Sequence, residues 1–324
     1  MVRFKVLSIK LPSRLPMLLR ASELKEIVSE AGFDLCGITP ATHLADSEER
    51  YMSWLNSGCG TGLEYLGNYL DLRFDASRLV EGAKTVIVCA INYKSEYSLA
   101  KCDDGASISS YALMRDYHKT IKRQMKGVLT CLSRKYGVAG RLFTDSAPLL
   151  EKALAVRAGL GWIGRQSLLV TKEYGTFVLL GEIVIDAEVD CYDEPIAVDK
   201  YACGSCRKCI DSCPTQAIND NMTLDARRCI ASRTIEFEDC GKEPLHGWVF
   251  GCDICQSCCP HNAKTPLSNS SITKPIISPP TPQEWKAMGQ REFEEFTAGT
   301  PIRRSSIARI HRAIELNELN RTKK

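Results

Sequence analysis

The strongest constraint on this chain is the grouping of its cysteines. Ten of its sixteen cysteines lie between Cys203 and Cys259, and only five occur in the first 190 residues. A first run, C-x-x-C-x-x-C-x-x-x-C-P, consists of Cys203, Cys206, Cys209 and Cys213. A second run, also closed by a proline, consists of Cys252, Cys255, Cys258 and Cys259. Residues 200–262 are therefore expected to be organised by bound metal.

The first run has the spacing of bacterial ferredoxins, in which three cysteines hold one [4Fe–4S] cluster and the fourth ligates another. A structural zinc site does not need three cysteines at this spacing and a fourth before proline, so we favour clusters over zinc or disulfides. The second run departs from ferredoxin symmetry, and Cys229 is the natural replacement ligand. We expect cluster one on Cys203, Cys206, Cys209 and Cys259. Cluster two is then expected on Cys213, Cys229, Cys252 and Cys255, which leaves Cys240 and Cys258 spare.

Composition adds few further constraints. The 324 residues are 44% hydrophobic, enough for a sizeable core, and the net charge of +3 favours no particular partner. No stretch approaches the roughly 20 apolar residues of a membrane span. Free cysteines suit a reducing compartment, so we expect a cytoplasmic protein. Residues 1–20 carry five basic side chains and no acidic one, and we expect a ragged extension there.

Residues 21–190 are expected to form an α/β domain, because helical and strand patterns alternate along them. We expect helices over 22–31 (Ser22 as N-cap), 116–136 and 148–158, and strands over 33–38, 85–91, 168–171 and 176–185. Residues 191–264 are expected to form a ferredoxin-like double-cluster domain. Residues 265–324 are expected to be a Pro/Ser-rich connector and a basic helical tail.

Three segments together resemble the epoxyqueuosine reductases. They are the cysteine module, YALMRDYHKTIK (111–122) and TDSAPLLEKALAVRAGLGWIGRQSLLVTKEYGTFVLLGEI (144–183), and the likeness covers roughly residues 22–310. The resemblance implies cobalamin beside two [4Fe–4S] clusters, in a domain similar to that of reductive dehalogenases. Because the sequence has no D-x-H-x-x-G motif, we expect the cobalamin to be bound base-off. It implies reduction of the epoxide of epoxyqueuosine in the anticodon loops of tRNAs for Asp, Asn, His and Tyr. It also implies reduced flavodoxin or ferredoxin as electron donor, and we expect a monomer.

The resemblance assigns roles residue by residue. Asp145 matches the family's proton donor, and a carboxylic acid held near neutral pH would need burial to raise its pKa. The residues expected at the cobalamin are Arg73, Asp145, Leu169, Thr171, Leu180, Glu182, Ala226, Cys255 and Gln256. Ser109 stands where some members have a cysteine. The C-terminal helical repeats of many members are not found in this sequence.

Several alternatives stay open on the sequence alone. Asp145 precedes a helix and could simply cap it. His118 could be a structural histidine, and no D-x-H-x-x-G motif marks it as a cobalt ligand. In the tail, Arg303, Arg304, Arg309 and Arg312 could contact tRNA phosphates or form a solvated face. The rival functions are another corrinoid iron–sulfur reductase, dehalogenase-like and acting on a small molecule, and an electron-transfer protein without a catalytic acid.

Overall fold

The computed structural model describes residues 19–99, 105–145, 147–197 and 202–321. Most of the expected N-terminal extension, Cys102 and the last three residues lie outside this part. The strands are β1 (Leu35–Pro40), β2 (Thr85–Asn92), β3 (Ser107–Ile108), β4 (Gly140–Phe143), β5 (Trp162–Ile163), β6 (Leu169–Val170), β7 (Val178–Ile185) and β8 (Trp248–Phe250). The longer helices are α1 (Ala21–Glu30), α2 (Ala45–Asn56), α4 (Tyr117–Tyr136), α5 (Glu151–Arg157), α10 (Gln290–Phe296) and α11 (Ile307–Arg321).

Short helices connect these elements. The short α-helices are α3 (Leu70–Arg73), α6 (Lys208–Asp211), α7 (Ile230–Ile235), α8 (Ile254–Ser257) and α9 (Pro282–Ala287). The 3₁₀ turns are η1 (Glu64–Gly67), η2 (Ala76–Arg78), η3 (Glu96–Leu99), η4 (Ser110–Leu113), η6 (Pro260–Asn262) and η7 (Pro301–Arg304).

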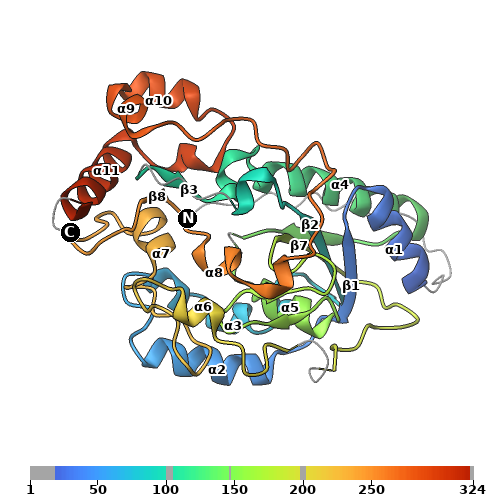
Figure 1. The fold of residues 1–324 in the computed structure, drawn as a ribbon. Helices are drawn as coiled ribbons and strands as arrows, with labels where there is room; N and C mark the ends of the chain where they lie inside the picture. Colours follow the sequence, from blue (N-terminus) through green and yellow to red (C-terminus); the bar gives the residue numbers. More distant parts are fainter. Residues whose placement is uncertain (1–18, 100–104, 146, 198–201, 322–324) are drawn as a thin grey trace.

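A four-stranded antiparallel sheet, in the order β1-β2-β7-β4, forms the centre of the molecule (Figure 1). Every residue of β2 is buried, since both faces of the sheet are covered. One face packs on α1 and α4, through side chains such as Leu24, Ile121 and Met125. The other face packs on α5, through side chains such as Leu154 and Leu180. The sheet therefore separates two apolar layers.

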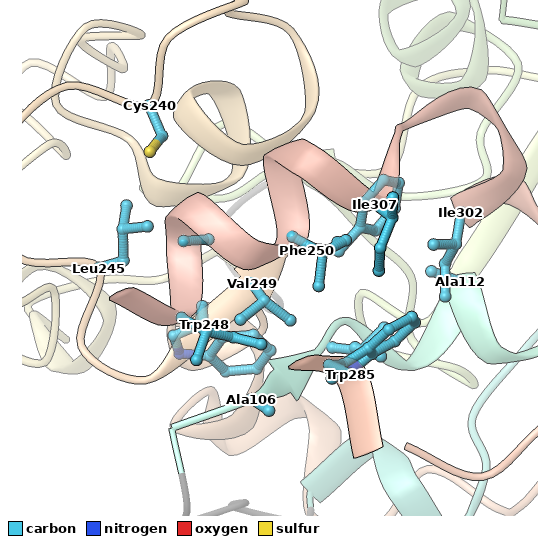
Figure 2. Close-up of a cluster of buried hydrophobic side chains, with 14 of the residues drawn as sticks. Ala106, Ala112, Cys240, Leu245, Trp248, Val249, Phe250, Trp285, Ile302 and Ile307 are labelled. Carbon is cyan, nitrogen blue, oxygen red and sulfur yellow. The ribbon is translucent and has the colours of Figure 1, made fainter. Parts of the chain in front are cut away.

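A third apolar cluster, separate from these two layers, holds the C-terminal elements to the rest of the chain. It joins η4 and β3–β8 to Trp285, Phe293 and one face of α11. Figure 2 shows Trp248, Val249 and Phe250 lying against α11, with Ile307 and Trp285 beside them. Residues far apart in the sequence thus share one core, and the tail is packed rather than only basic. This core crosses the domain boundaries expected at 190 and 264, which stay a prediction.

The long elements agree with the sequence pattern, and the local details differ. Strand β2 and helix α4 have the expected bounds within one residue, because each has an unbroken apolar run or stripe. The expected N-cap at Ser22 is wrong: the helix begins at Ala21, and Arg20 stands at the cap without a side-chain hydrogen bond. Helix α5 begins at Glu151 rather than Pro148, because the chain after Asp145 turns before it coils.

Candidate functional site

Asp145 lies two residues after β4, at the sheet edge. Its backbone has φ of 58°, a left-handed conformation that short polar side chains tolerate better than most. The side chain is half exposed, with a relative exposure of 50%, so the carboxylate faces solvent on one side. On its other side, Oδ2 lies 2.7 Å from Nε2 of His118. Asp145 therefore presents a carboxylate that is both accessible and held.

Three side chains form a continuous carboxylate–imidazole–carboxylate chain. Asp116 caps the N-terminus of α4 by accepting a hydrogen bond from the backbone N–H of His118, at 3.1 Å. Its Oδ1 also lies 2.6 Å from Nδ1 of the same histidine. The His118 ring is buried and stacks on the ring of Tyr117 at 4.0 Å between centroids. The position of His118 is therefore fixed by α4, and it can pass or receive a proton at Asp145.

The capping alternative for Asp145 is not seen. The residue at the N-cap of α5 is Leu150, which makes no side-chain cap bond. The backbone N–H of Asp145 instead donates to the Glu151 carboxylate. Glu151 thus fixes the loop that carries Asp145, a role that the sequence pattern D-x-x-P-x-x-E could have suggested.

The expected direction of the Asp145 pKa is wrong in this structure. The hydrogen bond from His118 is the largest influence, and it lowers the pKa of Asp145 below its ordinary value although burial acts in the opposite direction. Nη1 of Arg304, 3.9 Å from Oδ2, adds to the lowering. Asp145 is therefore ionised in the neutral range, and His118 is the neighbour from which it can take a proton.

Two further carboxyl groups, those of Glu151 and Glu182, lie next to Asp145. Glu182 is fully buried on β7, and neither carboxyl oxygen makes a hydrogen bond of good geometry within the described part of the protein. Burial and then the neighbouring Glu151 raise the pKa of Glu182 well above its usual value. Burial also raises the pKa of Glu151 to about 7. At least one of the two is thus protonated at neutral pH.

The cysteine thiols lie in two neighbourhoods, and Cys258 borders both of them. Cys209 and Cys259 both lie within electrostatic range of Cys203, and Cys259 also of Cys206. Separately, Cys252 is influenced by Cys213 and Cys229, and Cys255 by Cys252 and Cys229. We refer to the two sets of thiols expected to hold the clusters as the first quartet (Cys203, Cys206, Cys209, Cys259) and the second quartet (Cys213, Cys229, Cys252, Cys255); this division stays a prediction.

The chemistry of these thiols suits iron clusters. Burial raises the pKa of Cys209 to about 11 and that of Cys255 well above the usual range, so a bound cation is needed to stabilise thiolates there. No three His, Cys, Asp or Glu side chains of the described residues lie close enough to surround one ion. A cube spreads its four ligands around four irons, so its ligands need not surround a single ion.

The two spare cysteines differ in their surroundings. Cys258 lies near the first quartet, within electrostatic range of Cys206 and Cys209, so its thiol is a neighbour of the ligands rather than distant from them. Cys240 is buried, and its carbonyl accepts two hydrogen bonds from Arg233, at 2.8 and 2.6 Å. Cys240 therefore contributes to packing of the loop after α7.

The residues expected at the cobalamin include some on the α5 side of the sheet and others in the cysteine module. Leu169 and Leu180 belong to the apolar layer that packs on α5, and Thr171 is buried beside them in the turn to Gly175. Ala226 lies in the cysteine module and donates its N–H to the Cys59 carbonyl at 2.8 Å. Gln256, next to Cys255, accepts hydrogen bonds from Thr176 and Tyr93, at 2.9 and 3.1 Å.

Several buried side-chain polar atoms have no partner in the described part of the chain. They include Nε of Arg73, both carboxyl oxygens of Glu182 and Nε2 of Gln166. Such atoms are costly unless something satisfies them. A large ligand with many amide groups, such as a corrin, has the donors and acceptors that these residues need.

Ser109 is tied to the cysteine module. Its hydroxyl donates to Oδ1 of Asp253 at 2.5 Å, and the Ser110 N–H donates to Oδ2 at 2.7 Å. Asp253 is buried between Cys252 and Cys255, and the Gln256 side-chain amide also contacts it, at 3.2 Å. The loop that leads into α4 is thus anchored to the second quartet. Sequence reasoning missed Asp253, since nothing in its local pattern distinguishes it.

The four arginines proposed for RNA contact have different surroundings. Arg304 is exposed and lies beside Asp145, whereas Arg303 pairs with Glu294 at 3.0 Å and Arg312 with Asp239 at 3.1 Å. Arg309 donates to the carbonyls of Ile235 and Phe237 at the end of α7. Arg304 is therefore the one of the four that the fold brings to the site.

Comparison with known proteins agrees with this architecture. The family model described as "4Fe-4S double cluster binding domain" matches residues 202–262, and the one described as "Epoxyqueuosine reductase QueG, DUF1730" matches residues 73–146. No helix in the described ranges combines the length and apolar character needed to cross a membrane. The molecule is thus of the class of oxidoreductases with two [4Fe–4S] clusters.

Individual relatives narrow the class. An epoxyqueuosine reductase of Cyclobacterium marinum is 43% identical over 74% of this chain and 78% of its own, and one of Leadbetterella byssophila is 35% identical over 91% and 97%. The chain belongs to the epoxyqueuosine reductase family. A crystal structure of an epoxyqueuosine reductase with an epoxyqueuosine-modified tRNA-Tyr stem loop superposes with a TM-score of 0.80, at 26% identity over 91% of this chain and 80% of that one.

Proposed function

We propose that this protein reduces the epoxide of epoxyqueuosine in tRNA to the alkene of queuosine. The observation that carries the proposal is the Asp145 carboxylate, accessible on one side and 2.7 Å from His118 on the other, in a chain that also carries two thiol quartets. The reaction consumes two electrons and two protons and releases the epoxide oxygen as water. The clusters can supply electrons one at a time, and the carboxylate–imidazole chain can supply protons.

The proposal includes cobalamin, and the residues present fit it. Within the described ranges, Arg73, Glu182 and Gln166 have buried polar atoms without partners. Leu169 and Leu180 belong to the apolar layer that packs on α5. Thr171, Ala226 and Gln256 are the further residues that we assign to this ligand. When bound and reduced, cobalamin supplies the electron-rich centre that amino-acid side chains lack. Base-off binding agrees with His118, whose two ring nitrogens both contact carboxylates.

The protein's own groups deliver the proton. The Asp145 side chain is half exposed, so its carboxyl group can reach and protonate an oxygen that leaves from the substrate. Its low pKa means that it gives up this proton readily, and His118 is placed to replace it across the 2.7 Å contact. Asp116 holds the imidazole in line. This arrangement is a relay rather than a single buried acid.

The remaining parts of the proposal follow from chemistry. The substrate is the anticodon loop of tRNAs for Asp, Asn, His and Tyr, and Arg304 beside Asp145 is the tail residue best placed for a phosphate. Reduced flavodoxin or ferredoxin serves as donor, by way of the first quartet. The tRNA substrate and the donor protein both fit a cytoplasmic location, where thiolate ligands remain reduced.

The test uses the full chain, prepared without oxygen, loaded with iron, sulfide and cobalamin, and supplied with a chemical reductant. Transfer RNA that contains epoxyqueuosine is added, and its nucleosides are analysed after digestion. Conversion to queuosine by the wild type, and its loss in Asp145→Asn at unchanged iron and cobalt content, are expected. A wild-type enzyme that leaves epoxyqueuosine intact but reduces a halogenated small molecule would replace this proposal by the dehalogenase-like one.

A further inference from the structure

Helix α4 carries an unusual distribution of charge. Its 20 residues include no Asp or Glu, and six of them are Lys or Arg. We define the α4 track as Lys119, Lys122, Arg123, Lys126 and Arg134, all exposed. At 100° per residue these side chains fall on one side of the helix, opposite the buried Ile121, Met125, Val128 and Leu132. The track is therefore a single stripe on the solvent face of α4.

The charges of the track are not neutralised by the protein. Within the described residues, none of the five forms an ion pair, whereas neighbouring Lys135 pairs with Glu23. Pairs such as Lys119 and Arg123, or Lys122 and Lys126, are four residues apart, a spacing at which like charges destabilise a helix. An anionic partner would relieve this repulsion.

The track also coincides with a surface depression. A shallow groove of about 620 Å³ is lined by Arg123, Lys126, Gly127, Thr130, Cys131, Arg134 and Lys135. Four of these seven residues are cations. Gly127 has no side chain and the side chain of Thr130 is small and polar, so an extended ligand has room to lie in the groove.

The direction of the track relates it to the site. Helix α4 begins at Tyr117, next to His118, which contacts Asp145, and the track runs outward from there over about 22 Å. The backbone N–H of Asp116 donates to Gly299, so η7 with Arg304 lies at the inner end. A strand of phosphates that starts at Arg304 can thus continue along α4.

We propose that the α4 track binds the phosphodiester backbone of the RNA whose modified base enters the site beside Asp145. The inference rests on the proposed function and adds the surface that holds the substrate. An acidic electron-donor protein is a poorer match, because it must approach a thiol quartet. Helix α4 packs on the sheet face that carries α1, whereas the cysteine module hydrogen-bonds to Trp54 of α2, below the sheet in Figure 1.

The first experiment measures binding of an anticodon stem–loop transcript to the cluster-loaded protein over a range of salt concentrations. The track variant is Lys122→Gln/Arg123→Gln/Lys126→Gln. The control variant, Lys84→Gln/Lys242→Gln/Lys264→Gln, removes the same charge from exposed positions elsewhere. The salt slope of the track variant should fall by about 2, since each phosphate contact contributes roughly 0.7–0.9, and the loss in turnover should appear in KM for tRNA. The control should keep the wild-type slope.

A second measurement needs no substitution. Cys131 lies in the groove and Cys191 lies outside it, and both are exposed. Bound stem–loop should slow alkylation of Cys131 several-fold while leaving Cys191 unchanged, as read by peptide mass spectrometry.

The inference and the function fail differently. If the wild type converts epoxyqueuosine in tRNA but the track variant keeps the wild-type slope and Cys131 stays reactive, the track is not the RNA surface. The same holds if the track and control variants lose affinity equally, or if only an acidic donor protein protects Cys131. If the wild type itself neither binds nor converts the tRNA, the proposed function fails.

Discussion

At the scale of single residues, the site depends on opposing influences on a few carboxyl groups. Hydrogen bonding from His118 keeps the pKa of Asp145 low, while burial keeps those of Glu151 and Glu182 high. Three carboxyl groups in one region therefore differ in charge at the same pH. The protein can present an anion at the surface and retain a proton just beneath it.

We predict that His118→Gln shifts the pKa of Asp145 upward. The histidine is the main cause of the lowered value, and the burial that opposes it remains. The limb of the pH profile of kcat/KM that reports Asp145 should then move to higher pH. A profile that keeps its shape and loses only amplitude would contradict the relay.

Asp145→Asn should lose about 10²-fold or more in kcat, the usual contribution of a placed acid.

We predict that Glu151→Gln reduces the pH dependence of the free energy of unfolding. The folded pKa of about 7 lies above the ordinary value of 4.5, so the folded state binds more protons than the unfolded state between these values. The free energy of unfolding of the wild type should therefore fall as pH rises from about 4.5 to 7. Denaturant titrations at several pH values measure it. Glu26→Gln, at an exposed position, is the control and should leave the slope unchanged.

At the scale of elements, the close approach of α4 to the sheet positions His118. Gly181 on β7 lies under α4, and a Cβ there would come within 2.6 Å of Cγ2 of Ile121 and 2.9 Å of Sδ of Met125. Only glycine lets the helix pack at this distance. Helix α4, which carries His118, and strand β7, which pairs with the strand before Asp145, thus meet at a residue without a side chain.

We predict that Gly181→Ala destabilises the protein by about 1–3 kcal/mol, the range seen for overpacked cores. Thermal and denaturant unfolding of the cluster-loaded protein measures it. Gly127→Ala is the matched control, because a Cβ at that exposed helical position meets no atom within 4 Å. It should stabilise by about 0.5–1 kcal/mol. Equal effects of both substitutions would show that the contact does not limit packing.

The elements differ in how far the sequence predicts them. Strand β2 and helix α4 are evident from their apolar patterns, and the double-cluster domain follows from cysteine spacing. The Asp145–His118 contact could not be predicted, because 27 residues separate its partners and the loop conformation brings them together. Asp253 and Arg309 are bound by tertiary contacts that have no local sequence signal.

At the scale of the whole molecule, bound metal and apolar packing both stabilise the cysteine module. Residues 202–262 have few long elements, but β8 and α7 belong to the core around Trp285 and α11. The parts of the module that lie outside this core depend on the thiols and what they bind. Loss of metal should therefore affect one part of the chain more than another.

We predict that chelation of iron under anaerobic conditions increases amide exchange in residues 203–229, since metal binding there contributes folding free energy. Residues 245–250 should stay protected, because they pack in the apolar cluster with α11. Hydrogen–deuterium exchange with mass spectrometry, before and after chelation, measures both.

The loaded protein should contain about eight irons, from two four-iron cubes.

The short helices α6 and α8 have a consequence for maturation. The segment with α6 supplies Cys209 to the first quartet and Cys213 to the second, and the segment with α8 supplies Cys259 to the first and Cys255 to the second. Filling one quartet therefore draws the ligands of the other into place. When iron is scarce, cells should hold fully loaded and empty chains, with few half-loaded ones that could receive electrons and leak them to oxygen.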